Sequence, residues 1–312
     1  MRDDDSSNPP KLVQMVPPSP VDSPPPSVDM EVGFGALSRQ GPGRSVNDDH
    51  YLIMRMGRHL ETLKTSLPDG DLPRHFDEYG YGMVIADGMG SAGDLASRLA
   101  IATLVQLAID FSKWHVRVNE PIADEMMDRA ERYYRSVDSI LQQAGHRYPG
   151  ALQTTMTAVY TAGSELFFAH VGHSRAYLFR DDHLMQLTRD HTLDRDRPGN
   201  ATIVDVSASA QDQRHIVTET LGVAGAGPVR VDVERCGLVD GDIVLLTTNG
   251  LTDVAEDARI AEALRLPGTP DDRCRALVGL AASSGATDDA TVLVAHYRIR
   301  AAAVDSEAGT NH

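Results

Sequence analysis

Acidic side chains recur at the ends of strand-like runs, and this pattern is the one in the sequence that could carry chemistry. Asp48 and Asp49 precede the run HYLIMRM, and Asp87 follows the run YGMVIA. Asn249 follows the run DIVLLTT, and Asp288 and Asp289 precede the last run, ATVLVAHY. Hard oxygen ligands that converge from four strand ends would bind Mg²⁺ or Mn²⁺.

Each of these motifs has an ordinary alternative interpretation as a turn. Asp-Gly and Asn-Gly, which occur at Asp87 and Asn249, are common turn dipeptides, so one such motif alone favours a plain turn. Four motifs, each at the end of a strand-like run, favour a shared cation site instead.

A second candidate for chemistry is Ser174, because residues 172–176, Gly-His-Ser-Arg-Ala, fit a loose G-x-S-x-[GA] pattern. A nucleophile elbow needs a strand, a sharp turn and then a helix. The residues after Ser174 alternate as in a strand, and the sequence RDDH then marks a turn, so a β-hairpin is predicted here. We therefore interpret Ser174 as a turn residue without a catalytic role.

The elements that must position these residues are strands joined by short turns, together with three long helical segments. The helices are expected from about Ala92 to Phe111, from Asn119 to about Ala144, and near Asp271 to Ser283. Strand-like runs are EVGFGALS, HYLIMRM, YGMVIA, MTAVYTA, ELFFAHV, RAYLFR, DIVLLTT and ATVLVAHY. Because several strands follow one another directly, we predict an α+β fold with largely antiparallel sheets.

Composition excludes several function classes. The chain has 312 residues and a formal net charge of −16, which disfavours nucleic-acid binding and binding to an acidic membrane surface. The longest apolar run, Ala96 to Phe111, carries Arg98 and Asp110 and predicts a buried helix rather than a membrane span. Cys236 and Cys274 have no metal or redox spacing. We expect a cytoplasmic protein without a signal peptide.

The two ends differ in composition from the rest of the chain. The first 29 residues hold eight of the 17 prolines and many Ser and Asp, so residues 1–30 are predicted to be a disordered Pro/Ser-rich arm. Residues 298–312 are predicted to be a disordered tail. One domain is expected over residues 31–297.

The motifs, taken in order, resemble those of the metal-dependent protein phosphatase family (PPM, or type 2C) in its bacterial form. RSVNDD is similar to R-x-x-N-E-D, and VIADGMGSAGDLAS is similar to V-A-D-G-M-G-G-x-x-x-G-E-x-A-S with a shorter glycine loop. AHVGHSRAYLFRDDHLMQLTRDH, GDIVLLTTNGLTD and TDDATVLVA follow in family order. The resemblance spans about Glu31 to Tyr297 and implies a four-layer α-β-β-α sandwich of two mainly antiparallel sheets flanked by helices.

The resemblance also implies a pair of metal ions, Mn²⁺ or Mg²⁺, at one end of the sandwich. Asp87 would bridge both ions, with the Gly88 carbonyl on the second ion. Asp49, assisted by Asp48, would serve the second ion through waters, and Asp288 would serve the first ion. The shared hydroxide would attack a phosphate monoester in line, without a protein nucleophile.

The implied activity is that of a protein serine/threonine phosphatase acting on phosphorylated proteins in a Ser/Thr kinase pathway. Arg44 lies where the family places its phosphate-binding arginine, and a guanidinium suits a phosphoryl group bidentately. The alternative for Arg44 is a solvated loop charge. Residues 192–213 lie where bacterial members carry a flap, and a plain surface loop is the alternative.

Two departures from the family pattern leave two hypotheses open. The family's first-metal aspartate is Asn249 here, which keeps a carbonyl oxygen but loses a charge and should weaken that metal site. His173 stands where the family has an aspartate that is often tied to a third metal ion. This histidine either removes the third metal site or shifts the site's preference toward softer ions. The alternative is that His173 is simply a hydrogen-bonded turn residue. The chain is then a working phosphatase or a pseudophosphatase that binds a phosphoprotein or another partner.

Overall fold

The computed structural model describes residues 29–68, 71–113, 115–148, 152–193, 217–225 and 227–300. The helices are the 3-10 helix η1 (Gly90–Ala92), α1 (Gly93–Phe111), α2 (Glu120–Gly145), α4 (Asn249–Thr252), α5 (Asp257–Arg265) and α6 (Pro270–Ser283). The strands are β1 (Asp29–Arg39), β2 (Asp49–Glu61), β3 (His75–Met89), β4 (Gln153–Thr154), β5 (Met156–Ala162), β6 (Glu165–Val171), β7 (Arg175–Arg180), β8 (His183–Gln186), β9 (Asp232–Gly237), β10 (Ile243–Thr247) and β11 (Ala290–Arg300).

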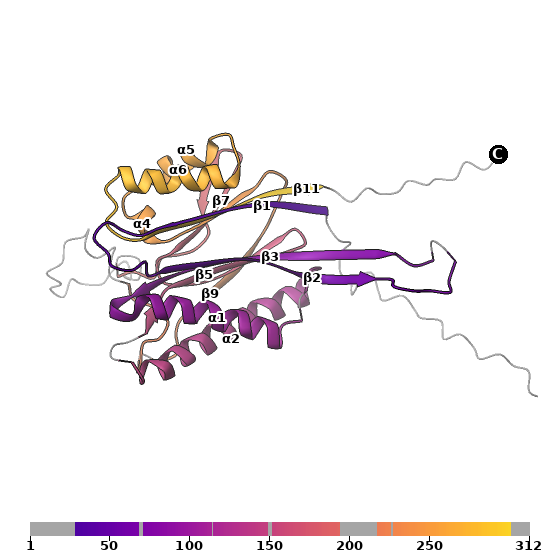
Figure 1. Cartoon of the computed structure of the whole chain (residues 1–312), viewed down its shortest axis with the longest axis horizontal. Coiled ribbons are helices and arrows are strands. Elements are labelled where there is room, and N and C mark those ends of the chain that lie inside the picture. The colour runs from indigo at the N-terminus through magenta and orange to yellow at the C-terminus, as the bar shows by residue number, and fades with distance from the viewer. Residues whose placement is uncertain are drawn as a thin grey trace, which may run out of the picture.

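Two antiparallel sheets lie face to face, with helices on their outer sides (Figure 1). One sheet has the order β1-β11-β10-β7-β8, and α5 and α6 cover it. The other has the order β2-β3-β5-β6-β9, with β4 paired to β3, and α1 and α2 cover it. The predicted four-layer α-β-β-α arrangement is confirmed.

Period-two alternation in the central strands explains how both faces of a sheet become buried. In β10, Val244 and Leu246 point into the core between the sheets, whereas Ile243 and Leu245 point toward α5 and α6. All five residues of β10 are buried. A strand that is covered on both faces reads as a continuous apolar run, and this is the pattern of DIVLLTT.

Helix α1 covers its sheet with one side only. Ala96, Ala100 and Leu104 recur at helical spacing and are buried against the sheet and α2. Ile109 and Phe111 are exposed, so the prediction of a buried helix holds for one face alone. By length and hydropathy, residues 90–111 also match a membrane span, although in the fold this segment forms part of an outer layer.

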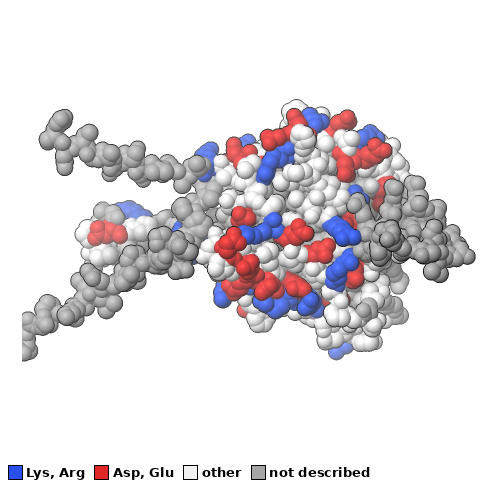
Figure 2. Space-filling model, turned by 180° about the vertical axis from the view of Figure 1, so that it is seen from behind, with Lys and Arg blue, Asp and Glu red and all other residues white. Residues whose placement is uncertain are grey.

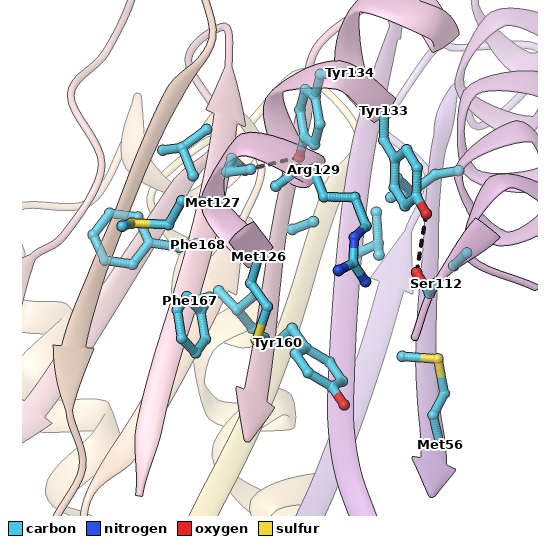
Figure 3. A pocket seen from close by; sticks show the side chains of 18 of the residues that line it. Met56, Ser112, Met126, Met127, Arg129, Tyr133, Tyr134, Tyr160, Phe167 and Phe168 are labelled. Carbon is cyan, nitrogen blue, oxygen red and sulfur yellow. Dashed lines mark hydrogen bonds between the residues drawn. The ribbon is translucent and has the colours of Figure 1, made fainter. Parts of the chain in front are cut away.

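An apolar cavity of about 150 Å³ lies between α2 and the second sheet (Figure 3). Its lining includes Met126, Tyr133, Tyr160 and Phe167, and the guanidinium of Arg129 points into it. The cavity shares no lining residue with the acidic strand-end motifs, so it belongs to the helix layer.

Several boundaries differ from the prediction. Strands β1 and β11 pair along their whole length, from Asp29 with Arg300 to Arg39 with Ala290, so the ordered core begins before residue 31 and ends after residue 297. Strand β9 and helices α4 and α5 were not predicted. The predicted arm (residues 1–28), most of the tail (301–312) and the greater part of the predicted flap (194–213) lie outside the described residues.

The close approach of α6 to β1 gives a test of this packing. A Cβ atom added at Gly35 would lie 2.3 Å from the backbone carbon of Pro270, whereas one at Gly33 would meet only the Pro270 side chain at 3.5 Å. We expect Gly35→Ala to lower the free energy of unfolding by about 1–3 kcal/mol through overpacking. Gly33→Ala, two residues away on the same face, is the control and should change it by less than about 1 kcal/mol. Urea unfolding measures both, and equal effects would contradict the packing.

Candidate active site

Asp49 and Asp87 lie directly opposite each other at the end of the β2–β3 ladder. Both side chains are buried, with 5% and 7% of their surface exposed. The first residue of β2 thus meets a residue near the end of β3, which the antiparallel register requires. The structure therefore brings two of the predicted carboxylates together at one end of the sandwich.

Two threonines of the opposite sheet hold Asp49. The hydroxyls of Thr248 and Thr291 donate to Asp49 Oδ2 at 2.8 and 2.7 Å. Thr248 directly follows β10 and Thr291 lies in β11, so these hydrogen bonds to the first residue of β2 link the two sheets at this end. The other carboxylate oxygen, Oδ1, is buried and has no hydrogen-bond partner among the described residues.

Asp48 joins the strand end to the start of helix α1. Its Oδ1 accepts from the backbone N–H of Asp94 at 2.8 Å, in the first turn of α1. Its backbone carbonyl accepts from the Ser97 hydroxyl at 2.6 Å and from the Gly88 N–H at 3.1 Å. The side chain that was predicted to assist a metal therefore also caps a helix.

Arg44 lies among three carboxylates. Its Nη1 donates to Asp48 Oδ2 at 3.2 Å, and its Nη2 donates to Asp288. Its Nε lies 3.8 Å from Asp289 Oδ2. The side chain remains 35% exposed, so the guanidinium reaches both the acidic cluster and the solvent. These contacts do not fit the alternative that Arg44 is a plain solvated loop charge.

Asp289, to which the sequence assigned no role, fixes the loop before β2. Its Oδ1 accepts from the Gly41 N–H and its Oδ2 from the Asp48 N–H, both at 2.8 Å. It is 2% exposed, whereas the neighbouring Asp288 is 35% exposed. Of the adjacent pair, Asp289 is thus a buried anchor, and Asp288 is the carboxylate available to a ligand.

Gly88 lies where the strand end meets the helix start. A Cβ atom at Gly88 would lie 2.0 Å from the Gly93 carbonyl oxygen, so no larger residue fits. The carbonyl of the preceding residue, Asp87, accepts from Thr155 N–H at 2.9 Å and from the Thr154 hydroxyl at 2.8 Å. The backbone around Asp87 is therefore fixed on both sides.

Asn249 is the first residue of α4, beside the Asp289 backbone. A Cβ atom on the next residue, Gly250, would lie 2.0 Å from the Asp289 carbonyl oxygen. The Asn249 Nδ2 donates to Asp253 Oδ2 at 3.0 Å, which leaves its Oδ1 buried and without a partner among the described residues. The amide therefore offers an oxygen, and no charge, at this end of the sandwich.

His173 lies in the crossing from β6 in one sheet to β7 in the other. Burial lowers the pKa of His173 against the opposing fields of Asp253, Asp190 and Asp288, so the ring is neutral at neutral pH. Its Nδ1 is buried and has no hydrogen-bond partner among the described residues. The simplest interpretation, a hydrogen-bonded turn residue, does not account for that nitrogen.

Buried histidines support the crossing loop. His191 Nδ1 accepts from the Gly172 N–H at 3.2 Å, and its Nε2 lies 3.0 Å from Asp232 Oδ2. His170 donates from Nε2 to the Gly172 carbonyl at 3.0 Å, and burial lowers the pKa of His170 to about 3. These contacts hold Gly172 at a φ of 114°, a conformation that favours glycine.

Ser174 is fully buried in the same loop. Its hydroxyl pairs with the Thr155 hydroxyl at 2.9 Å, and a strand, not a helix, follows it. The hairpin predicted after it is confirmed as β7–β8, which turns at Asp181 and Asp182 with positive φ. The Ser174 hydroxyl is therefore not accessible to a substrate, and the residue is not followed by the helix that a nucleophile elbow requires.

Burial, and after it charge repulsion, dominates the electrostatics of the cluster. Burial first, and then the fields of Asp289 and Asp288, raise the pKa of Asp49 to about 7, although its two threonine hydrogen bonds act to lower it. Burial and the field of Asp49 raise the pKa of Asp87 well above its ordinary value. Two neighbouring buried carboxylates cannot both ionise at low cost unless a cation joins them.

The donors fit a hard divalent cation. Carboxylate and amide oxygens are the ligands that Mg²⁺ and Mn²⁺ prefer, and the buried Oδ1 atoms of Asp49 and Asn249 have no hydrogen-bond partner among the described residues. A cation would satisfy such atoms, which otherwise carry a desolvation penalty. Thr248, Thr291 and Asp289 were missed as site residues because their contribution depends on how the two sheets pack.

Comparisons with known proteins agree with this geometry. The sequence profile of the family described as protein phosphatase 2C matches residues 68–265, more than half of the chain. The serine/threonine protein phosphatase PstP of Mycobacterium tuberculosis is 33% identical over 217 residues, which make up 68% of this chain and 40% of PstP. The chain thus matches less than half of that relative's length.

Solved structures show the same fold. The serine/threonine phosphatase of S. agalactiae superposes with a TM-score of 0.66 at 26% identity, over 85% of this chain and 99% of that one. The catalytic domain of PstP in complex with two manganese ions superposes with a TM-score of 0.59 at 23% identity, over 86% and 99%. The chain belongs to the protein phosphatase 2C family, as its motifs predicted.

The raised pKa of Asp49 predicts an unusual pH dependence for the metal-free protein. An aspartate that keeps its proton to about pH 7 when folded, and loses it near pH 4 when unfolded, stabilises the fold at low pH and loses that contribution as pH rises. Between about pH 5 and about pH 8, the free energy of unfolding in a chelator should fall by about 3 kcal/mol. Urea unfolding across this range measures the fall.

Asp49→Asn should reduce that slope, because the amide does not titrate. Asp124→Asn, at an exposed position on α2, should leave the slope unchanged. If the free energy of unfolding of the metal-free wild type stays level or increases with pH, the raised pKa of Asp49 would be contradicted.

Proposed function

We propose that this chain is a metal-dependent phosphatase that hydrolyses phosphate monoesters on serine or threonine residues of proteins. The observation that carries the proposal is the burial of Asp49 and Asp87 side by side at a strand end, with the Asp49 Oδ1 lacking a hydrogen-bond partner. Membership of the protein phosphatase 2C family supports it.

In this proposal Asp87 would hold both cations, and its position opposite Asp49 and within the field of Asp288 supports this role. The Gly88 carbonyl and Asp49 would serve one ion, and Asp288 with the Asn249 amide oxygen would serve the other. A bound pair of Mn²⁺ or Mg²⁺ ions supplies an activated water and offsets the negative charge of a phosphoryl group. The PstP structure with two manganese ions supports a pair.

The chain's own residues orient these groups. Thr248 and Thr291 occupy one oxygen of Asp49, so the carboxylate presents its other oxygen in a fixed direction. Arg44 presents a partly exposed guanidinium at the rim, where it would bind the phosphoryl oxygens bidentately. Asp48 and Asp288 hold that guanidinium in place until the phosphoryl group binds.

A second candidate function follows from Asn249. The amide puts no charge on the first ion, and its Nδ2 is held by Asp253. A site weakened in this way could keep the cleft for binding a phosphoprotein without turnover, as a pseudophosphatase. The remaining carboxylates favour activity over this alternative.

Partners and location form part of the same proposal. The substrates would be phosphorylated proteins in a Ser/Thr kinase pathway in the cytoplasm. The names of the similar proteins, which are serine/threonine phosphatases, support the substrate class.

Hydrolysis of a small aryl phosphate and of a phosphothreonine peptide, titrated with Mn²⁺, tests the proposal. Wild type should hydrolyse both in a Mn²⁺-dependent manner, and Asp87→Asn should lower kcat by at least about a hundredfold. Asn249→Asp should lower the Mn²⁺ concentration for half-maximal activity by about tenfold, because it adds a charged ligand. Asp124→Asn is the matched control.

Two outcomes would contradict the proposed phosphatase activity or its mechanism. Wild type that shows no metal-dependent turnover, while Asn249→Asp gains it, would establish the binding module instead. Activity that survives Asp87→Asn at full rate would remove the proposed cation pair from the reaction.

A further inference from the structure

The hairpin formed by β2 and β3 runs past the edge of the sandwich (Figure 1). The two strands pair from Asp49 with Asp87 as far as Glu61 with His75. Strand β5 pairs with β3 only from Tyr81 to Ile85, so the outer part of the hairpin, from the Met56–Gly80 pair to the Glu61–His75 pair, is a ribbon of two strands. Such a ribbon gains little stability from a hydrophobic core.

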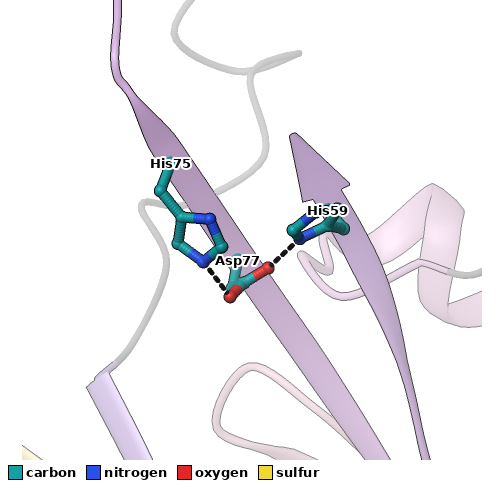
Figure 4. Close-up of side chains that lie close together, drawn as sticks. All are labelled: His59, His75 and Asp77. Atoms are coloured by element: carbon teal, nitrogen blue, oxygen red, sulfur yellow. Dashed lines mark hydrogen bonds and ion pairs between the residues drawn. The ribbon is translucent and has the colours of Figure 1, made fainter. Parts of the chain in front are cut away.

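Two histidines and an aspartate face one another across this ribbon (Figure 4). The register places His59 opposite Asp77 and Glu61 opposite His75. Because side chains two residues apart share a face of a strand, all four side chains lie on the same face. None of these four residues belongs to a motif of the acidic strand-end pattern.

Their ligand atoms already lie close together. His59 Nδ1 lies 2.6 Å from Asp77 Oδ1, and His75 Nε2 contacts Asp77 Oδ2. The two imidazole rings are 5.1 Å apart between centroids and tilted by 68°. One ligand atom from each of the three residues lies within 4.8 Å of the others.

Two imidazoles and a carboxylate form a donor set for a transition metal ion. Donors bound to one Zn²⁺ ion at about 2.0–2.1 Å lie at most about 4.2 Å apart, so small side-chain rotations would bring this set into range. All three side chains are at least partly exposed, which leaves room for those rotations. Asp77 directs one carboxylate oxygen toward each histidine.

This donor set differs in kind from that of the acidic cluster. Imidazole nitrogens suit Zn²⁺, Ni²⁺ and Cu²⁺, whereas the all-oxygen cluster suits Mg²⁺ and Mn²⁺. The hairpin site also lies at the opposite end of β2 and β3 from Asp49 and Asp87. The two sites can therefore be occupied separately.

We propose that His59, His75 and Asp77 bind one divalent transition metal ion of the Zn²⁺ class, with Glu61 as a fourth ligand. The ion joins the two strands at the end of the ribbon and fixes their register where no third strand supports them. This inference does not depend on the phosphatase activity.

Calorimetric titration of the full chain with Zn²⁺, in an excess of Mg²⁺ that occupies the oxygen cluster, tests the proposal. Wild type should bind one Zn²⁺ that the double variant His59→Asn/His75→Asn binds at least about tenfold more weakly. His183→Asn changes another exposed histidine, on β8, and should bind as wild type does. Imidazole NMR resonances of His59 and His75 should shift on adding Zn²⁺.

The substituted side chains are more than half exposed, so the double variant should fold, and its metal-free unfolding midpoint checks this. Asp77→Asn, which keeps the shape but removes the charge, should also weaken binding. Equal Zn²⁺ uptake by wild type and the double variant, with no shift of the two imidazole resonances, would overturn the proposal. The histidines would then only hold Asp77 by hydrogen bonds.

Discussion

Repulsion between buried carboxylates is the constraint on which the rest of this structure depends. Asp49 and Asp87 face each other in a β-ladder with almost no exposed surface, and Asp288 and Asp289 add to the field. Because both side chains are buried, the cost of ionising them together is large unless cations are bound. Arg44 compensates part of this charge from the rim.

The packing of the two sheets against each other keeps these carboxylates together despite their repulsion. Asp49 comes from one sheet, and the hydroxyls that hold it come from the other. Asp289, directly before β11, binds the backbone of the loop that carries Arg44 and Asp48. A change in the packing of the two sheets would therefore alter the cluster directly. Figure 2 shows that acidic and basic side chains are intermingled over one face of the molecule.

The acidic cluster could be predicted from sequence because its members have a shared local signature. Each is a hard oxygen donor beside an apolar run, and strand ends in one sandwich meet at one edge. The threonine hydroxyls could not be predicted in this way, since Thr248 and Thr291 pair with Asp49 only after two sheets pack. Asp288 and Asp289 are adjacent acidic residues, and only the loop geometry decides which one is buried.

Apolar periodicity in the sequence predicted much of the fold. The elements that were not predicted have no clear apolar periodicity. Strands β5, β6 and β7 match their predicted runs, and the long helices begin within a residue or two of their predicted starts. The outer third of the β2–β3 hairpin is largely exposed, so no apolar alternation extended the prediction beyond the core. Helix α5 has nine residues, too short for a clear helical period.

The substitutions at Asn249 and His173 leave the fold of the site intact and change what it offers a cation. Asn249 supplies a neutral oxygen, and His173 supplies a neutral nitrogen without a hydrogen-bond partner among the described residues. In the proposed metal site, the balance between five aspartates, one arginine and these two neutral groups would set the affinity for metal.

The most direct test of the cation cluster is the number of Mn²⁺ ions bound per chain at equilibrium, in wild type and in Asp87→Ala. If Asp87 joins two ions, wild type should bind about two more Mn²⁺ per chain than the variant does. Equal numbers in the two proteins would contradict the account, because the carboxylates would then be buried together without a cation to join them.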